Sequence, residues 1–172
     1  VGTVTTRAGT GAASSQDGAA DVATFYSPTG IAATTNGMLV LITDDAHHRV
    51  RRFLPQALYP FPPSLPPVPS YPPSAPPAPP MPPPTPPGTL ITTLAGWSYG
   101  HADGTGTSAR FYSPWDVALA PSGEFAFVVD YTYHVIRHID VETAVVTTFA
   151  GSVGSAGGTD GVGASARFQY PS

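Results

Sequence analysis

The sequence predicts an all-β protein built from repeated, four-stranded antiparallel units. Three observations support this prediction. One sequence pattern occurs twice in full and begins a third time, β-branched residues dominate the apolar runs, and apolar positions do not recur at helical spacing. Recognising the repeat first matters, because a residue that recurs in every copy is more often part of the architecture than part of a site.

The repeat is defined by residues at fixed offsets. In each copy an Asp-Gly pair is followed by a phenylalanine, and a proline comes three residues after the phenylalanine. In the first two copies a second aspartate and then a histidine follow downstream. The repeat positions are Asp17, Phe25, Pro28, Asp44 and His48 in the first copy, Asp103, Phe111, Pro114, Asp130 and His134 in the second, and Asp160, Phe168 and Pro171 in the third.

Each complete copy contains four candidate strands. In the second copy, residues 115–120 end at the turn sequence Pro-Ser-Gly, and residues 124–130 alternate with the period of a strand. Residues 134–140 and the run "VVTTFAG" complete the set. The first copy offers "GIAAT", "MLVLITD", "HRVRRF" and, beyond an insert, "TLITTLAG". Four short strands in a unit of about 40 to 55 residues are typical of a β-propeller blade.

The repeats also predict the domain organisation. Phe53 and Ile139 lie at equivalent positions, but the next threonine pair follows much later in the first copy, so this copy carries an insert. The predicted segments are a first repeat at 1–53, a proline-rich insert at 54–88, a second repeat at 89–145 and the start of a third at 146–172.

The pattern resembles that of the NHL-repeat β-propellers. The resemblance rests on a threonine pair before Ala-Gly, on Asp-Gly, on Ala-Arg-Phe, and on the run from a histidine to an arginine that includes His48, Arg49 and Arg51. It covers the chain except for the insert. His47 and Tyr133 stand where the family has asparagine, and Asp116 stands opposite Gly30. The resemblance implies the fold and leaves the function open, because NHL propellers serve many tasks.

Composition excludes several classes of function. The net charge is −4, and the seven basic residues are all arginine, too few for a nucleic-acid-binding face. The chain has no cysteine, and no apolar run is long enough to span a bilayer. Because it begins without methionine and ends within a repeat, we expect it to be part of a longer protein.

We predict no catalytic, metal or cofactor site, and therefore no enzyme. His48 and His134 recur at one position, so we expect them to join the second and third strands, bonding Asp44 and Asp130. Metal binding is the weaker alternative, because His47 and His48 lack a third ligand nearby. Some NHL-related proteins are lyases with histidine-bound metal, and five histidines give that idea little support.

The remaining repeat residues have structural interpretations. The Asp-Gly pairs favour turns rather than calcium loops, because no alternating oxygen ligands follow them. We expect Arg110 and Arg167 to pair with these aspartates or to cap strand ends. Phe25, Phe111 and Phe168 are expected to fill the core between blades. The glycine-rich segments lack the features of a phosphate-binding loop.

The insert contains 18 of the 22 prolines and no charged residue. Such a sequence favours a polyproline II rod, roughly 90 Å long at 3.1 Å per residue. It can serve as a ligand for proline-binding modules, as a spacer, or as a scaffold for sugars. We favour the third, because the tract resembles the hydroxyproline-rich glycoproteins of plants and green algae, which carry O-linked arabinose and galactose. The candidate modified residues are Pro62, Pro63, Pro66, Pro67, Pro72, Pro73, Pro76, Pro77, Pro79, Pro80, Pro82, Pro83, Pro84, Pro86, Pro87, Ser64, Ser70 and Ser74.

These observations lead to a functional prediction with a clear alternative. The first is an extracellular structural glycoprotein of a fibril, cell wall, cell surface or flagellar coat, self-associating into filaments or with other coat glycoproteins. Its contacts would use strand edges and the aromatics Tyr26, Trp97, Tyr112 and Trp115. The alternative is a propeller module of a sensor or adhesion protein that binds a protein or a glycan.

Overall fold

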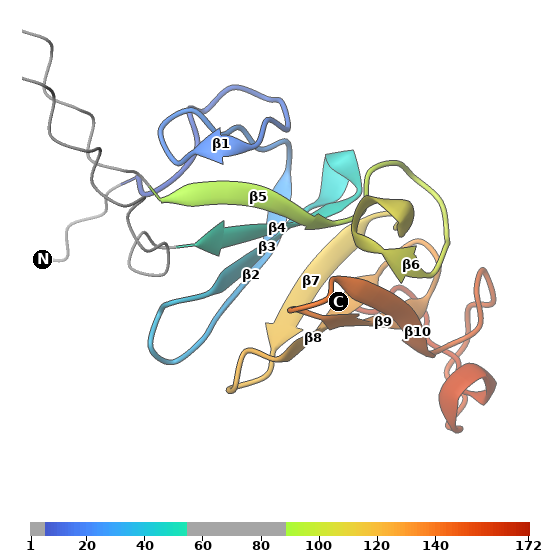
Figure 1. Ribbon diagram of the computed structural model, residues 1–172. Coiled ribbons are helices and arrows are strands. Elements are labelled where there is room, and N and C mark those ends of the chain that lie inside the picture. Colours follow the sequence, from blue (N-terminus) through green and yellow to red (C-terminus); the bar gives the residue numbers. More distant parts are fainter. Residues whose placement is uncertain (1–5, 55–88) are drawn as a thin grey trace, which may run out of the picture.

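The computed structural model describes residues 6–54 and 89–172, and the structural statements below concern these residues. They form two antiparallel sheets, and the helical elements are three short 3-10 turns (Figure 1). The prediction of an all-β fold made of blade-like units is therefore confirmed. The turns are η1 (Asp45–His47), η3 (Gly106–Ser108) and η4 (Gly163–Ser165).

Each sheet contains four long strands and one two-residue strand at its edge. The first sheet has the order β1 (Gly18–Ala19), β5 (Leu90–Ala95), β4 (Arg49–Leu54), β3 (Val40–Asp44) and β2 (Pro28–Ala33). The second has the order β6 (Gly104–Thr105), β10 (Val145–Ala150), β9 (Val135–Asp140), β8 (Phe125–Asp130) and β7 (Pro114–Leu119). The short strand comes from the segment that enters the blade, and it pairs with the fourth long strand.

The sheets do not follow the boundaries of the sequence repeats. β5 lies beyond the insert in sequence, yet it pairs with β4, and Leu54 stands opposite Leu90. The predicted polyproline II segment falls between these two strands, and residues 55–88 lie outside the described residues. The two ends of the insert are therefore attached side by side at one end of the first sheet.

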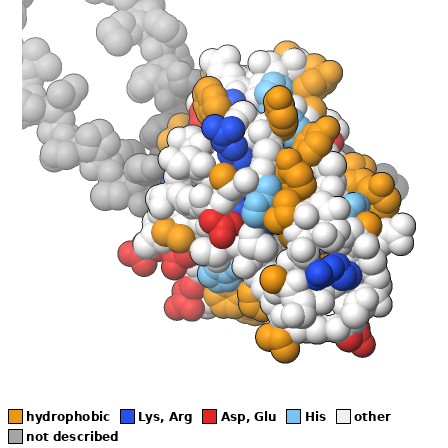
Figure 2. Space-filling view, turned by 90° about the vertical axis from the view of Figure 1, so that its right-hand side faces the viewer, with side chains coloured by type: hydrophobic (Ala, Val, Ile, Leu, Met, Phe, Trp, Pro, Cys, Tyr) orange, Lys and Arg blue, Asp and Glu red, His pale blue; other side chains and the backbone are white. Residues whose placement is uncertain are grey.

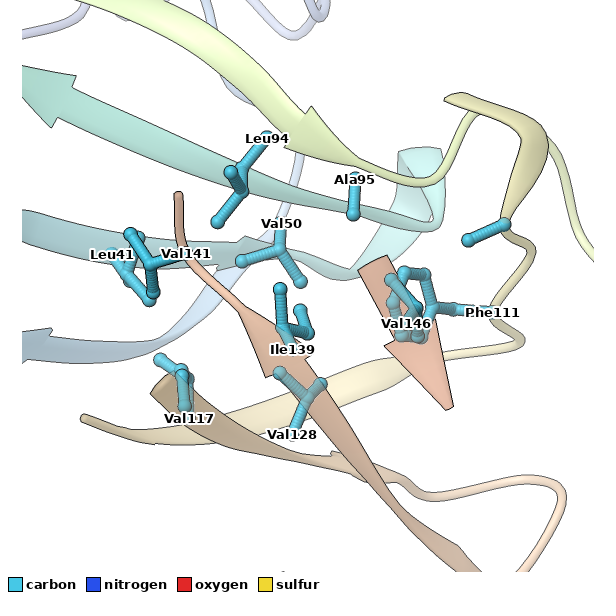
Figure 3. Close-up of a cluster of buried hydrophobic side chains, with 12 residues drawn as sticks. Leu41, Val50, Leu94, Ala95, Phe111, Val117, Val128, Ile139, Val141 and Val146 are labelled. Carbon is cyan, nitrogen blue, oxygen red and sulfur yellow. The ribbon is translucent and has the colours of Figure 1, made fainter. Parts of the chain in front are cut away.

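The core lies between the two sheets (Figure 3). The first sheet contributes Leu41, Val50 and Leu94, and the second places branched aliphatic side chains against them. The latter are Val117, Val128, Ile139 and Val146. Burying one such side chain completely stabilises the folded state by roughly 1.5 to 3 kcal/mol. The alternation seen in the sequence therefore places one face of each strand in this interface.

The turn that enters each blade has an unusual backbone conformation in every copy. Ser27, Ser113 and Tyr170 have φ angles of 66°, 65° and 47°, in the left-handed region. The histidines after β3 and β8 also lie there, at 55° for His48 and 59° for His134. Non-glycine residues rarely adopt this conformation, so its recurrence shows that the repeat specifies the loops as well as the strands.

No helix among the described residues is both long enough and apolar enough to cross a membrane.

Candidate functional site

A buried arginine organises each blade below its loops. Arg51 in β4 forms an ion pair with the carboxylate of Asp17 at 2.7 Å and donates to the carboxylate of Asp44 at 3.2 Å. It also donates to the backbone carbonyl oxygens of Thr24 and Gln16, at 3.0 and 2.9 Å. A buried guanidinium needs such partners, because removing a charge from water is costly unless it is paired and hydrogen-bonded.

The second blade repeats this arrangement. Arg137 in β9 donates to Asp103 at 2.8 Å and lies 3.7 Å from the carboxylate of Asp130. Its guanidinium also donates to the carbonyl oxygens of Ala102 and Arg110, each at 2.9 Å. Both guanidinium groups lie over phenylalanine rings, Arg51 over Phe25 at 5.0 Å and Arg137 over Phe111 at 5.1 Å.

This network corrects the prediction for the arginine of Ala-Arg-Phe. Arg110 is exposed and takes part through its carbonyl oxygen, and the guanidinium that pairs with Asp103 belongs to Arg137. Arg167 donates to the carbonyl oxygens of Ala164 and Ala166, at 2.6 and 2.8 Å. The prediction of an aspartate partner is therefore wrong for Arg110, because Arg137, two strands away, reaches Asp103 from inside the sheet, and the bonds of Arg167 run to carbonyl oxygens instead.

The Asp-Gly aspartates also bind the second residue of the threonine pair. Asp17 accepts from the backbone N–H and the hydroxyl of Thr93, and Asp103 accepts from the hydroxyl of Thr148. Burial alone would raise the pKa of Asp103, but the bonds from Thr148 and the charge of Arg137 hold it below its usual value. These aspartates thus fasten the incoming segment to the fourth long strand, β5 or β10.

Asp44 and Asp130, at the ends of β3 and β8, hold the loop that enters the blade. Asp44 accepts from the backbone N–H of Tyr26 at 2.9 Å, and Asp130 accepts from that of Tyr112 at 3.2 Å. Burial raises the pKa of Asp130 to about 7, against the N–H of Tyr112 and the charge of Arg137.

The recurrent histidines lie in the loops that join the second and third strands, as predicted, and their side chains bond to the next repeat. Nδ1 of His48 accepts from the backbone N–H of Ser113 at 3.4 Å, and Nδ1 of His134 accepts from that of Tyr170 at 3.2 Å. The expected bonds from these histidines to Asp44 and Asp130 are therefore replaced by bonds to the following repeat.

The other repeat positions fall in several environments. Phe111 is fully buried, whereas Phe25 and Phe168 are half-buried. Pro28 and Pro114 begin the innermost strands β2 and β7, Pro171 is half-buried near the end of the chain, and Asp160 is exposed.

Five aromatic rings form a continuous cluster on one end of the blades, which we call the aromatic band. It consists of His48, Tyr99, His101, Tyr112 and Tyr133. Ring centroids lie 5.6 Å apart for His48 and Tyr112, 6.0 Å for Tyr99 and Tyr112, and 5.7 Å for Tyr112 and Tyr133. His101 lies 5.7 Å from Tyr133. Figure 2 shows hydrophobic and histidine side chains gathered in a band across one face of the molecule.

Loops of both blades position these rings. His48 follows η1 between β3 and β4, and Tyr133 lies between β8 and β9. Tyr112 precedes β7, and Tyr99 and His101 lie between β5 and β6. Because connections between antiparallel strands alternate between the two ends of a sheet, these loops meet at the same end. Tyr99 is 69% exposed and Tyr112 is 39% exposed, so ring surface is open to a ligand.

The histidines of the aromatic band are neutral near pH 7. Burial lowers the pKa of His48, and the nearby charge of Asp45 opposes this shift. Burial also lowers the pKa of His101, whose Nε2 lies 2.9 Å from the hydroxyl of Thr148. The aromatic band is therefore a neutral, ring-rich surface.

Exposed aromatics flank the aromatic band. The rings of Tyr26 and His47 are tilted by 60° with centroids 5.4 Å apart, and the guanidinium of Arg49 lies over the ring of Trp97 at 4.0 Å. Sequence reasoning identified Tyr26, Trp97 and Tyr112 as interface aromatics.

Sequence reasoning missed Tyr99, His101 and Tyr133. One signal was available: the loop "WSYGH" is aromatic in the second copy, whereas the corresponding loops read "TGAASSQ" and "SVGSAGG". A departure from the repeat background marks residues that the fold itself does not require.

The described residues, 6–54 and 89–172, contain no group of three histidine, cysteine, aspartate or glutamate side chains that could hold a metal ion.

Comparison with known proteins relates these blades to NHL repeats. No protein-family model matches the chain. Over 64 residues, 37% of the chain, it is 39% identical to NHL repeat-containing protein 2 of Gallus gallus, and it spans only 8% of the length of that protein. This comparison supports the predicted resemblance to NHL-repeat proteins.

Solved structures show the same fold. The chain is similar to an auxiliary nutrient binding protein from Bacteroides thetaiotaomicron, with a TM-score of 0.57 and 20% identity over 82% of this chain and 30% of that one. A second auxiliary nutrient binding protein, from Bacteroides ovatus, gives a TM-score of 0.55 and 19% identity, again over 82% of this chain and 30% of that one. At these identities the likeness concerns the fold alone.

Proposed function

We propose that this chain supplies blades of a ligand-binding β-propeller module, with the aromatic band as its binding surface and a protein or a glycan as its ligand. The observation that carries the proposal is the exposed ring cluster at the end of the sheets where the loop between β3 and β4 meets the loop between β8 and β9. Tyrosine and tryptophan are enriched in binding surfaces, because each offers a large apolar area and a polar group at low entropic cost.

The scaffold beneath the aromatic band suits recognition. Tyr112 is held by the bond from its backbone N–H to Asp130, and Asp130 lies against the buried Arg137. Binding loops on a rigid support lose little conformational freedom when a ligand arrives. The two nutrient-binding neighbours share the fold and lend support to a binding role for the larger protein.

The structural-glycoprotein interpretation depends on the proline-rich insert. Its sugars, its extracellular location and its filaments stay predictions, because the insert lies outside the described residues. The absence of catalysis is likewise part of the proposal. We prefer the binding module because the aromatic band belongs to the described blades.

An array of glycans and peptides, probed with the full chain, tests the proposal. Each hit is then measured by isothermal titration calorimetry with the variants Tyr99→Ala and Tyr112→Ala. A matched control is Phe149→Ala, which removes an exposed ring from β10, outside the aromatic band. We expect Tyr99→Ala and Tyr112→Ala to lose binding, and we expect the control to bind as tightly as the wild type. Equal binding by all three variants would contradict the proposal.

A further inference from the structure

The rings of the aromatic band are inclined to one another. Tyr99 and Tyr112 make an interplanar angle of 52°, and Tyr112 and Tyr133 make one of 62°. Adjacent rings set at such angles form a ridged surface instead of a flat stacking platform. Grooves lined by aromatic rings are the way in which several unrelated domains bind polyproline II segments, with proline rings packed between the aromatic ones.

The hydrogen-bonding capacity of the aromatic band fits a proline-rich ligand. Within the described part of the chain, no hydrogen bond engages the hydroxyl groups of Tyr99, Tyr112 or Tyr133. These hydroxyls can therefore donate to a ligand. Consecutive prolines have carbonyl acceptors and no backbone N–H donor, so a proline-rich segment needs donors from its partner. A polyproline II segment has no internal hydrogen bonds that compete for those carbonyls.

The lack of charge on the aromatic band also matches the lack of charge on the proline tract. With His48 and His101 neutral near pH 7, the aromatic band offers rings and hydroxyl groups rather than ions. The tract at 55–88 contains no charged residue and is dense in proline. An uncharged, apolar segment loses little hydration when it is buried against such a surface.

The position of the insert favours a second copy as the source of the ligand. Both ends of the insert are attached where Leu54 stands opposite Leu90. β4 runs from Arg49, next to His48, to Leu54, and its length is about 17 Å at 3.3 Å per residue. The insert therefore leaves the blade at the end opposite to the aromatic band. The tract is thus anchored about the length of β4 away from the aromatic band of its own blades, which favours the aromatic band of a neighbouring molecule as its target.

We propose that the aromatic band binds a proline-rich segment, and that its occupant is the tract at 55–88 of a second copy of this chain. This inference rests on the proposed function and names its ligand. Proline rings pack against Tyr99, Tyr112 and Tyr133, and their carbonyl oxygens accept from the tyrosine hydroxyls. The same tract was assigned above to sugar attachment or to recognition by another module.

The first experiment measures binding of a fluorescent peptide with the sequence of residues 70–88 to the full chain by anisotropy. The control peptide has alanine in place of every second proline. We expect the native peptide to bind and the control peptide not to bind. The substitutions Tyr99→Ala and Tyr133→Ala should each weaken binding of the native peptide roughly tenfold. Phe149→Ala is the matched control and is expected to bind normally. Circular dichroism verifies that each variant is folded.

The second experiment identifies the source of the ligand. Sedimentation velocity over a range of concentrations is expected to show association of the full chain. Association should disappear when 55–88 is replaced by a Gly/Ser linker of equal length, or when excess peptide is added. Peptide binding without concentration-dependent association would overturn the assignment to a second copy. Failure of the peptide to bind would overturn the proline ligand, while binding of a glycan or another protein at Tyr99 and Tyr112 would leave the proposed function intact.

Discussion

The guanidinium of Arg137 donates to the carboxylate of Asp103 over 2.8 Å, and the same contact joins Arg51 to Asp17 at 2.7 Å in the other sheet. In both sheets the aspartate also binds a threonine of the fourth long strand. The aspartate therefore ties the segment that enters the blade to the third strand through an ion pair and to the fourth strand through a hydrogen bond. This contact explains why the Asp-Gly pair recurs where no ligand site is built.

Replacement of Arg137 by methionine is expected to destabilise the chain strongly. The substitution removes the cation that pairs with Asp103 and lies beside the buried Asp130, and it removes one of the donors to the backbone carbonyl oxygens of Arg110 and Ala102. Breaking a buried pair in this way costs about 3 to 5 kcal/mol, measured as the free energy of unfolding in urea. The control is Arg110→Met, which keeps the carbonyl oxygen and should change stability by about 0.5 kcal/mol or less. Similar small losses in both variants would contradict the role given to Arg137.

The fold could be predicted from the sequence because the same pattern of strands and turns occurs in more than one copy. Offsets between Asp, Phe, Pro and His define the repeat unit, and the alternation in "EFAFVVD" predicts a strand within it. The partners of the buried groups could not be predicted in this way. Arg137 and Asp103 are far apart in sequence, and spacing alone gave Arg110, a closer neighbour of the aspartate, as its partner.

Gly96→Ala tests the turn that follows each threonine pair. Gly96 has a φ angle of +87°, and an added Cβ would overlap with the carbonyl oxygen of His48 and lie 2.8 Å from the ring of Phe111. We expect a loss of about 2 to 5 kcal/mol in the free energy of unfolding, from the clash and the left-handed backbone together. The matched control is Gly37→Ala, with a φ angle of +67° and no atom within 4 Å of the added Cβ. That variant should lose only about 1 to 2 kcal/mol, so equal losses would show that the close approach is absent.

His48 should make the contact between the blades sensitive to acid. Its Nδ1 accepts from the N–H of Ser113, and a protonated ring cannot accept. Burial lowers the pKa of His48 from 6.5 in the folded state, so the unfolded chain binds more protons once the pH falls below 6.5. The contribution of His48 to stability is therefore lost as the pH falls through 6.5 and becomes constant below the folded pKa.

The variant His48→Asn isolates this effect, because asparagine tolerates the left-handed backbone and does not titrate. The difference in unfolding free energy between wild type and variant should decrease between pH 7.5 and pH 5. Titration of His101 occurs in both proteins and cancels. A difference that is independent of pH would refute the assignment of His48 as a neutral acceptor.

Asp130 should act in the opposite direction. Burial raises its pKa to about 7 in the folded state, against 3.8 ordinarily. The folded chain therefore holds a proton on Asp130 over a range in which the unfolded chain has released it. The resulting stability is fully present below pH 3.8 and is lost as the pH rises through 7.

Comparison with Asp130→Asn, measured as unfolding free energy from pH 5 to pH 8, should show wild type losing stability relative to the variant. Asp140→Asn is the control, because hydrogen bonds from Thr143 lower the pKa of the exposed Asp140 and its titration lies below this range. The Asp140→Asn difference should be flat over the same interval. A flat difference for Asp130→Asn as well would mean that its carboxyl group titrates normally.

The aromatic band was predicted only in part, for a physical reason. A repeat fixes the positions that every blade shares, and the sequence therefore identified Tyr112 at the entry turn. Tyr99 and His101 lie in a loop whose length and composition differ among the copies, so no offset constrains their place. Their proximity to Tyr133 depends on how two loops distant in sequence meet at the end of the sheets.

Sugar on the proline tract and docking of the tract concern the same residues, and this leads to a further prediction. Pentose units on the candidate prolines between Pro72 and Pro87 would stand between the proline rings and Tyr99. They would also replace the apolar edge of the tract by hydroxyl groups, which favour water over an aromatic surface. We therefore expect a 70–88 peptide carrying arabinose on hydroxyproline to bind the full chain at least about tenfold more weakly than the bare peptide, a difference of about 1.4 kcal/mol.

Fluorescence anisotropy with the two peptides measures this difference, and intact-mass analysis of the native chain shows which form of the tract the protein carries. A peptide with hydroxyproline but without sugar separates the effect of the added oxygen from that of the pentose. Binding of the glycosylated peptide as tightly as the bare one would show that the rings of the aromatic band do not pack against proline, because a contact between the two sets of rings leaves no room for the sugar.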